Sequence, residues 1–147
     1  MSDSYSFQDV TATLTGPSGD IDLGAGSANA EEGITISYAG AKNTMTIGAD
    51  GEGMHSLHAD KSGVITVNLL KTSPINKKLN LMYNAQSLSS ALWGNNVIVI
   101  RNKASGDVIT ARAVAFQKHP DTVYAKAGNT NGWPFDCLKI DKVLGEY

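Results

Sequence analysis

Two histidines are the first candidates for chemistry. His55 and His58 lie three positions apart in a glycine-rich stretch. Imidazole is a good zinc ligand, but in a strand this spacing points the two side chains to opposite faces, and no third ligand lies at a matching interval. The segment Asp20-x-Asp22-x-Gly24 has the opening spacing of a calcium loop but lacks its later oxygen ligands and its closing glutamate. We therefore expect no metal ion and no cofactor.

Nucleophilic catalysis has no better support. Cys137 is the only cysteine, and no histidine lies at the spacing of a cysteine catalyst, so a buried, inert thiol is expected. A single cysteine cannot form an internal disulfide, which fits a reducing cytoplasm. The glycines of Gly48-x-x-Gly51-x-Gly53 follow no buried strand and precede no helix, so they are not a phosphate-binding loop. No nucleophile elbow positions a serine. The sequence predicts a protein that is not an enzyme.

Charge is distributed unevenly along the chain. Residues 1–60 carry nine acidic residues and one basic residue, whereas residues 61–147 carry eleven basic and five acidic residues. One interpretation is that the fold interleaves the two halves and the asymmetry disappears. The other is that copies associate, acidic surface against basic surface, which predicts self-association that is sensitive to salt. Arg101, Lys103 and Arg112 could contact phosphates, but they lack interleaved aromatic residues, and a solvated rim is the better interpretation.

Alternating apolar and polar residues predict strands through most of the chain. The alternation is clear along residues 10–14 and again along residues 65–69. Segments rich in glycine between such runs are typical of tight turns. Strands are expected at residues 7–15, 20–23, 34–38, 62–70, 97–100, 108–118 and 122–124, with a loop at 126–133 and a closing strand around 138–140.

A single long helix is expected over about residues 73–93. Ser73 can accept a hydrogen bond from a free amide of the first turn, Pro74 suits the first helical position, and Gly94 is placed to end the helix. A helix with one apolar face needs a sheet to cover, and the row Ala111, Ala113 and Ala115 would permit close approach. The spacing of three and four places these residues on one wide face: Ile75, Leu79, Met82 and Gln86, with Leu81, Ala85, Leu88 and Leu92 beside them.

The remaining pattern completes the predicted fold. Residues 42–60 are expected to form a long protruding hairpin, because a glycine cluster separates two moderately apolar arms. The whole chain, residues 1–147, then forms one mainly β domain, an antiparallel sandwich or barrel flanked by one helix. No apolar run approaches the ~20 residues of a membrane span, and the N-terminus lacks the pattern of a signal peptide. Trp93 and Trp133 are expected in the core or, alternatively, at a subunit interface.

Three segments together resemble the tail tube proteins of contractile-tailed bacteriophages. They are YSFQDVTATLTGPSGDIDLG, SPINKKLNLMYNAQSLSSALWGNN and GNTNGWPFDCLKID, and the central one is the most specific. The resemblance extends over essentially the whole chain. It implies a β-barrel-like sandwich flanked by one helix, related in fold to the tube protein of type VI secretion.

The resemblance also implies a function. In that family six copies form a ring, their inner sheets join into one barrel around a channel, and the rings stack into a tube inside a contractile sheath. The genome passes through the tube into the host. The implied partners are other copies of the chain, the tail sheath protein, the tail terminator and baseplate proteins, and double-stranded DNA that passes without specific binding. The protein would be made in the host cytoplasm and become part of the virion.

The hairpin is implied to be the arm that contacts the adjacent ring. The candidate inter-ring contacts are Met45, Ile47, Asp50, Glu52, Met54 and Leu57. Candidate contacts with a lateral neighbour or the sheath are Asn84, Ser87 and Trp93. The N-terminal segment up to Phe7 and the tail around Glu146 are further candidates.

Two other classes of protein stay open. A tube protein of a type VI secretion-like contractile injection system would share the fold. A small β-sandwich binding module is the weaker alternative, because the sequence offers no groove rich in aromatic residues.

Overall fold

The computed structural model describes residues 4–6, 9–24, 29–127 and 130–146. The predicted contact at Phe7 therefore lies outside the described residues. The elements, in chain order, are β1 (Val10–Gly16), β2 (Gly19–Gly24), β3 (Asn29–Tyr38), β4 (Asn43–Ile47), β5 (Gly53–Leu57), β6 (Gly63–Leu70), α1 (Ile75–Gln86), β7 (Asn96–Asn102), β8 (Asp107–Phe116) and β9 (Thr130–Val143).

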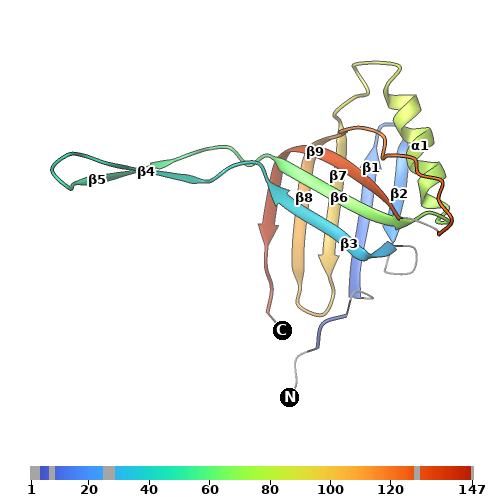
Figure 1. Ribbon diagram of the computed structural model, residues 1–147, viewed down its shortest axis with the longest axis horizontal. Coiled ribbons are helices and arrows are strands. Elements are labelled where there is room, and N and C mark those ends of the chain that lie inside the picture. Colours follow the sequence, from blue (N-terminus) through green and yellow to red (C-terminus); the bar gives the residue numbers. More distant parts are fainter. Residues whose placement is uncertain (1–3, 7–8, 25–28, 128–129, 147) are drawn as a thin grey trace.

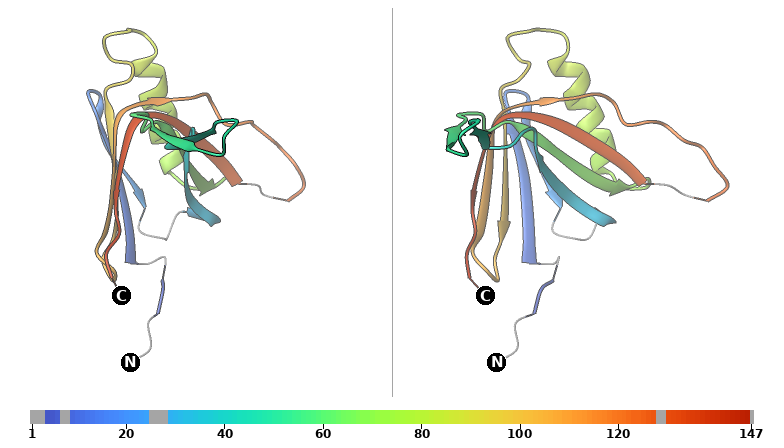
Figure 2. Two further views of the ribbon diagram at one scale, coloured as in Figure 1. Left: turned by 90° about the vertical axis from the view of Figure 1, so that its left-hand side faces the viewer. Right: turned by 60° about the vertical axis from the view of Figure 1, so that its left-hand side comes forward.

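Seven of these strands form one antiparallel sheet in the order β2-β1-β7-β8-β9-β6-β3, and β4 and β5 pair separately as a hairpin (Figure 1). The large sheet bends, as the turned views show (Figure 2). As a result Ile34 and Ile36 of β3 lie across a small gap from Val10, Ile100 and Ile109 on the other half of the sheet. The arrangement is sandwich-like, and the sheet does not close into a barrel, since β2 and β3 are its two ends. The prediction of a mainly β fold with one helix and a protruding hairpin is confirmed.

The core lies inside the bend of the sheet. Along β6 the odd-numbered side chains are buried and the even-numbered ones are partly exposed, until Leu70 at the end of the strand. This is the period of two that the sequence shows. The largest buried side chains come from β8 and β9: Phe116 is 2% exposed and Phe135 is fully buried, with ring centroids 5.0 Å apart.

The helix is shorter than predicted. It covers Ile75–Gln86, and Ser87 caps its end, so the prediction that it continues to residue 93 and ends at Gly94 is wrong. Residues 87–94 instead make turns, with Gly94 at φ +81°. At the start, Ser73 Oγ accepts a hydrogen bond from the Ile75 amide at 3.3 Å, as expected. Pro74 is the N-cap residue, so the prediction that Ser73 is the N-cap and Pro74 the first helical residue is wrong by one position.

The apolar face of α1 is also narrower than predicted. Ile75, Leu79, Met82 and Gln86 are buried, which confirms the central row. Leu81 is 58% exposed and Leu88, beyond the helix, is 87% exposed, so these two leucines do not belong to the covered face.

The alanine row of β8 does not form a seat for the helix. Ala113 has φ +51° and is the extra residue in the pairing of β8 with β7, whose register shifts between Ile98, opposite Ala111, and Asn96, opposite Val114. One extra residue in a strand inverts the alternation of side chains beyond it. Ala111 is therefore buried on the inner face, while Ala113 and Ala115 line a groove on the other face. The helix lies mainly against β2 and against Phe116, whose ring is 5.4 Å from Tyr83.

Two predictions for residues 117–133 are wrong. Residues 122–124 form no strand, and the expected loop at 126–133 ends earlier because β9 begins at Thr130. Trp133 and Phe135 in this part of β9 are buried against Phe116, and that apolar content extends the strand toward its N-terminus. The core interpretation of Trp133 is confirmed, since the side chain is 3% exposed and Nε1 donates to Asn76 Oδ1 at 2.9 Å.

A buried amide pair holds the C-terminal end of α1 to the sheet. Gln86 Nε2 donates to Asn96 Oδ1 at 2.7 Å, and Asn96 Nδ2 donates to Gln86 Oε1 at 2.8 Å. Both side chains are fully buried. Gln86 Nε2 also donates to Ser18 Oγ at 3.2 Å, which connects the β1–β2 turn to the helix.

Replacing Gln86 by alanine is expected to lower the free energy of unfolding by about 1–3 kcal/mol, because the buried Asn96 amide then loses both of its hydrogen bonds to Gln86. Urea unfolding followed by circular dichroism measures the change. Asn84→Ala, two residues earlier on the exposed side of the helix, is the control and should change stability by less than about 0.5 kcal/mol. Equal effects of the two substitutions would show that the amide pair contributes nothing specific.

Candidate assembly surfaces

The hairpin β4–β5 projects far from the sheet (Figure 1). Asn43 pairs with Leu57, Met45 with His55, and Ile47 with Gly53. Paired residues of antiparallel strands point to the same face, so one face carries Met45, Ile47 and Leu57 and the other carries Met54. Two-stranded hairpins are marginally stable by themselves in water.

Large apolar side chains on the hairpin are exposed to an unusual degree. Met45, Ile47 and Met54 are each 60% exposed and Leu57 is 81% exposed. Burial of such side chains contributes roughly 1.5–3 kcal/mol each. The hairpin exposes four of these side chains, so their burial against a partner would stabilise a complex.

The tip of the hairpin is a tight, acidic turn. The Gly48 amide donates to the Glu52 carbonyl at 2.7 Å, and the Glu52 amide donates to Asp50 Oδ1 at 3.1 Å. Gly51 has φ +89°, a conformation that favours glycine. Asp50 thus shapes the turn with its carboxylate, while Glu52 is exposed beside it.

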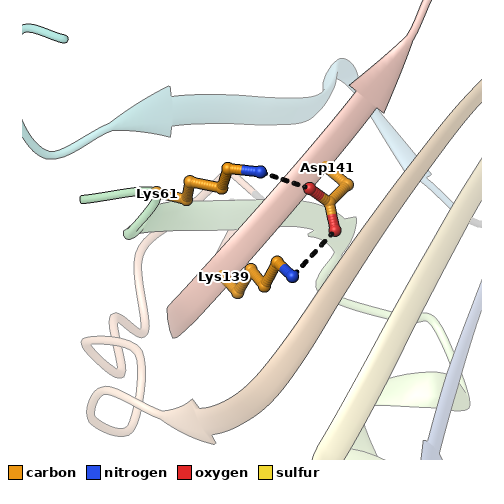
Figure 3. Close-up of polar contacts among 3 residues, drawn as sticks. All are labelled: Lys61, Lys139 and Asp141. Atoms are coloured by element: carbon orange, nitrogen blue, oxygen red, sulfur yellow. Dashed lines mark hydrogen bonds and ion pairs between the residues drawn. The ribbon is translucent and has the colours of Figure 1, made fainter. Parts of the chain in front are cut away.

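The base of the hairpin is fixed to β9. The Ile140 amide donates to the Lys61 carbonyl at 2.9 Å, and Lys61 Nζ lies 3.3 Å from Asp141 Oδ1 (Figure 3). Lys139 Nζ approaches the other carboxylate oxygen at 3.9 Å. The hydrogen bond from Lys61 is the main reason why the pKa of Asp141 is lowered. These contacts orient the base while the arm itself stays free of the sheet.

The histidines of the hairpin serve its own structure. His55 Nδ1 is 3.0 Å from Asn43 Nδ2, and His58 Nε2 is 2.5 Å from Thr44 Oγ1. Among the described residues no group of three or more His, Cys, Asp or Glu side chains could hold a metal ion.

The two end strands of the large sheet are a second candidate surface. The Ala39 amide donates to the Ser62 carbonyl at 3.0 Å, so the odd-numbered amides at this end of β3 point toward β6. Alternation then points the Ile34 and Ile36 amides to the open side. An unpaired strand edge is a template for a strand of another chain.

The residues predicted to contact a lateral neighbour or the sheath have different surroundings. Asn84 and Ser87 are exposed at the end of α1, where Ser87 Oγ donates to the Asn84 carbonyl at 3.0 Å. Trp93 is half-buried, with its ring centroid 5.6 Å from that of Tyr83. Near the C-terminus the Glu146 amide donates to the Ser105 carbonyl at 2.8 Å, so the tail is tied to the β7–β8 turn.

Cys137 is buried inside β9, as expected. Burial raises the pKa of its thiol to about 11, so the reactive thiolate is scarce at neutral pH. We expect a thiol reagent such as Ellman's reagent to label the folded protein at least ~100-fold more slowly than the urea-unfolded protein at pH 8. Comparable labelling rates would contradict the buried position of this thiol.

The sequence did not predict the partner of Gln86, the bulge at Ala113 or the groove beside α1 that Lys71, Lys77 and His119 line. An amide on an otherwise apolar helical face was the available signal for a buried polar pair. The bulge has no such signal, because alanine is not a residue that favours positive φ.

Chains of two solved assemblies share the fold of this chain. A solved structure of the anti-feeding prophage cap (AFP tube terminating cap) matches with a TM-score of 0.59 at 9% identity, over 99% of this chain and 95% of that chain. The sheath-tube complex of an extracellular contractile injection system, PVC, in its extended state matches with a TM-score of 0.51 at 11% identity, over 90% of this chain and 88% of that chain. A search of curated protein sequences found no match.

A comparison of the sequence with models of known protein families identifies the family of this chain. The model of the bacteriophage PhiTE tail tube protein matches residues 1–145, so this chain belongs to the phage tail tube family. It is a structural protein of the tail, and the family resemblance seen in the sequence is confirmed. Within the described residues no helix is long and apolar enough to cross a membrane.

Proposed function

We propose that six copies of this chain form a ring and that such rings stack into the inner tube of a contractile tail. The observation that carries the proposal is the free hairpin, whose four large apolar side chains are 60–81% exposed. In a stack of rings each hairpin can bury these side chains on the next ring. Stacking of this kind is a heterologous contact, which repeats without closing and therefore builds a filament. Met45, Ile47, Asp50, Glu52, Met54 and Leu57 are the proposed inter-ring contacts.

Ring closure is proposed to use the two ends of the large sheet. The open edge of β3 in one copy would pair with the open edge of β2 in the next copy, so that the sheets form one continuous surface around a channel. Repetition around the ring satisfies every exposed edge and removes the risk of uncontrolled strand pairing. The whole chain acts as a single tail-tube domain in this arrangement.

The tube is proposed to be the conduit for the genome and to lie inside a tail sheath. A conduit should not retain DNA, and the acidic residues that dominate the first 60 positions suit a channel wall that repels phosphates. Sheath contacts are proposed for Asn84, Ser87 and Trp93, while terminator and baseplate proteins would meet the two ends of the tube. The protein would reach the virion after synthesis in the host cytoplasm.

A tube in a contractile injection system is the second candidate. It is favoured by the fold shared with the anti-feeding prophage cap and with the PVC sheath-tube complex. Encapsidated genomic DNA in particles that contain this protein supports the phage tail, whereas particles loaded with protein effectors and no DNA support the injection system.

Native mass spectrometry of the purified protein tests the ring. We expect a discrete species with six times the mass of the 15.5 kDa chain. The population of this hexamer should fall as the salt concentration is raised, because charged surfaces contribute to association. A strictly monomeric protein at low salt and high concentration would exclude the hexameric ring.

A further inference from the structure

A basic groove lies at the end of the molecule opposite the hairpin. It has a volume of about 450 Å³ and separates the start of α1 from the segment that links β8 to β9. Its titratable side chains include Lys71, Lys77 and His119, and among its described lining residues none is acidic. The hairpin lies at one end of the long axis of the molecule, and α1 lies at the other end (Figure 1). In the view turned by 60° the hairpin lies on one side of the molecule and the segment that links β8 to β9 extends on the other (Figure 2).

Hydrogen bonds and ring contacts hold the side chains around this groove in place. Lys71 Nζ donates to the Val123 carbonyl and lies 4.3 Å from the centre of the Tyr124 ring. The His119 ring stacks on Tyr83 with centroids 3.8 Å apart. These contacts attach the linking segment to the helix, so the groove has a defined shape.

Lys77 is a groove residue whose charge has no partner among the described residues. It is exposed in the first turn of α1, and among the described residues no hydrogen bond or ion pair engages it. A cation in the first turn of a helix is unfavourable, and α1 has no acidic residue in that turn to compensate. Positive charge at this position is therefore not explained by the stability of the subunit.

The hairpin offers the complementary surface. Its tip presents the Asp50 and Glu52 carboxylates, and its arms present exposed apolar side chains. Beside the groove, Val123 is 46% exposed and Tyr124 is 88% exposed, which supplies apolar area next to the lysines. The hairpin and the groove therefore carry opposite charges, and each has exposed apolar side chains beside them.

We propose that the groove lined by Lys71, Lys77 and His119 is the acceptor for the hairpin tip of a second copy of this chain in the adjacent ring. The inference rests on the proposed stacking and names its receiving surface. Donor and acceptor lie at opposite ends of one subunit, so the contact repeats from ring to ring without saturating. The lysines bring the carboxylates to the correct neighbour, and the apolar arms then lose their exposure to water.

Charge reversal with a matched control tests the groove. Lys77→Glu should raise the protein concentration required for tube growth by ~10-fold, the change that 1.4 kcal/mol per contact produces. Lys78→Glu makes the same charge change one residue later, at an exposed position that does not line the groove, and should change the threshold by less than ~2-fold. Both substitutions place an acid in the first turn of α1, which favours the helix, so neither should impair folding.

The hairpin carries the reciprocal substitutions. Asp50→Asn keeps the oxygen that accepts from the Glu52 amide, and Glu52→Lys reverses the exposed charge. This double variant should also raise the threshold by ~10-fold, and adding Lys77→Glu to it should restore most of the tube growth, because the charges are then exchanged. Light scattering and negative-stain microscopy at physiological salt give both readouts.

The results distinguish failure of the groove as acceptor from failure of the proposed tube function on which it rests. Tubes that grow equally well from wild type, Lys77→Glu and Lys78→Glu would leave the tube function intact and overturn the groove as acceptor. The groove as acceptor would also be overturned if adding Lys77→Glu to the hairpin double variant does not restore tube growth. The same conclusion follows if Lys77→Glu abolishes binding of a short DNA duplex to the protein while tube growth is unchanged. Absence of rings and tubes from the wild type would overturn the proposed function and the acceptor together.

Discussion

Deleting residues 48–53 is expected to abolish tube growth while leaving a folded subunit. The tip lies outside the large sheet and carries no residue of the core, so the body keeps its buried contacts. The deletion removes the turn that joins β4 to β5 and both tip carboxylates. Without the turn the exposed apolar arms can no longer be presented to the next ring. Sedimentation velocity and negative-stain microscopy should find rings or smaller species and no tubes.

A milder variant separates the tip from the arms. Ile47→Ser removes one apolar side chain that is 60% exposed on the hairpin, and Leu81→Ser removes one that is 58% exposed on α1. If burial of the arm against another ring drives stacking, Ile47→Ser should weaken tube growth by roughly 1–2 kcal/mol per contact, or about 5–30-fold in the threshold concentration. Leu81→Ser should leave the growth of bare tubes unchanged. Unimpaired tube length in the deletion variant would remove the hairpin from stacking.

Placing a proline at Ile36 is expected to prevent ring closure. The Ile36 amide points to the open side of β3, so a proline there removes a donor from the edge and adds a ring that blocks an incoming strand. The pairing of β3 with β6 does not use that amide. Native mass spectrometry should show loss of the hexameric species with little change in the secondary structure measured by circular dichroism.

Two matched substitutions make the proline result specific. Ile36→Ala removes the same half-buried side chain but keeps the amide, so it should retain the ring at a modest cost in stability. Ser37→Pro removes an amide on the side of β6 and should damage the subunit itself. A hexamer that persists in Ile36→Pro would show that the β3 edge is not the ring interface.

Much of the fold could be predicted because the relevant signals are local. Alternation identified β1, β6 and β8, and the glycine cluster identified the hairpin with its bounds close to those observed. The predicted helix is too long because Leu88 and Leu92 continue the apolar spacing, whereas the observed helix ends at Gln86, whose side chain pairs with Asn96. A long-range amide pair of this kind has no signature in a helical period.

The assembly surfaces were only partly predictable. The exposed apolar residues of the hairpin could be named in advance, because the strand pattern there continues without a core to cover. The basic groove could not, since Lys71 and Lys77 approach His119 only after β6, α1 and the segment behind β8 come together. The alanines of β8 show the opposite failure: a period of two predicts one face, and a single bulge at Ala113 against β7 divides the row.

Electron microscopy of the purified wild-type protein at low salt is the most direct test of the proposed assembly into stacked rings. We expect hexagonal rings that stack into tubes with an open channel, in which the hairpin of each subunit reaches the adjacent ring. Discrete monomers at high concentration, with no rings or tubes even when the sheath protein is added, would contradict it.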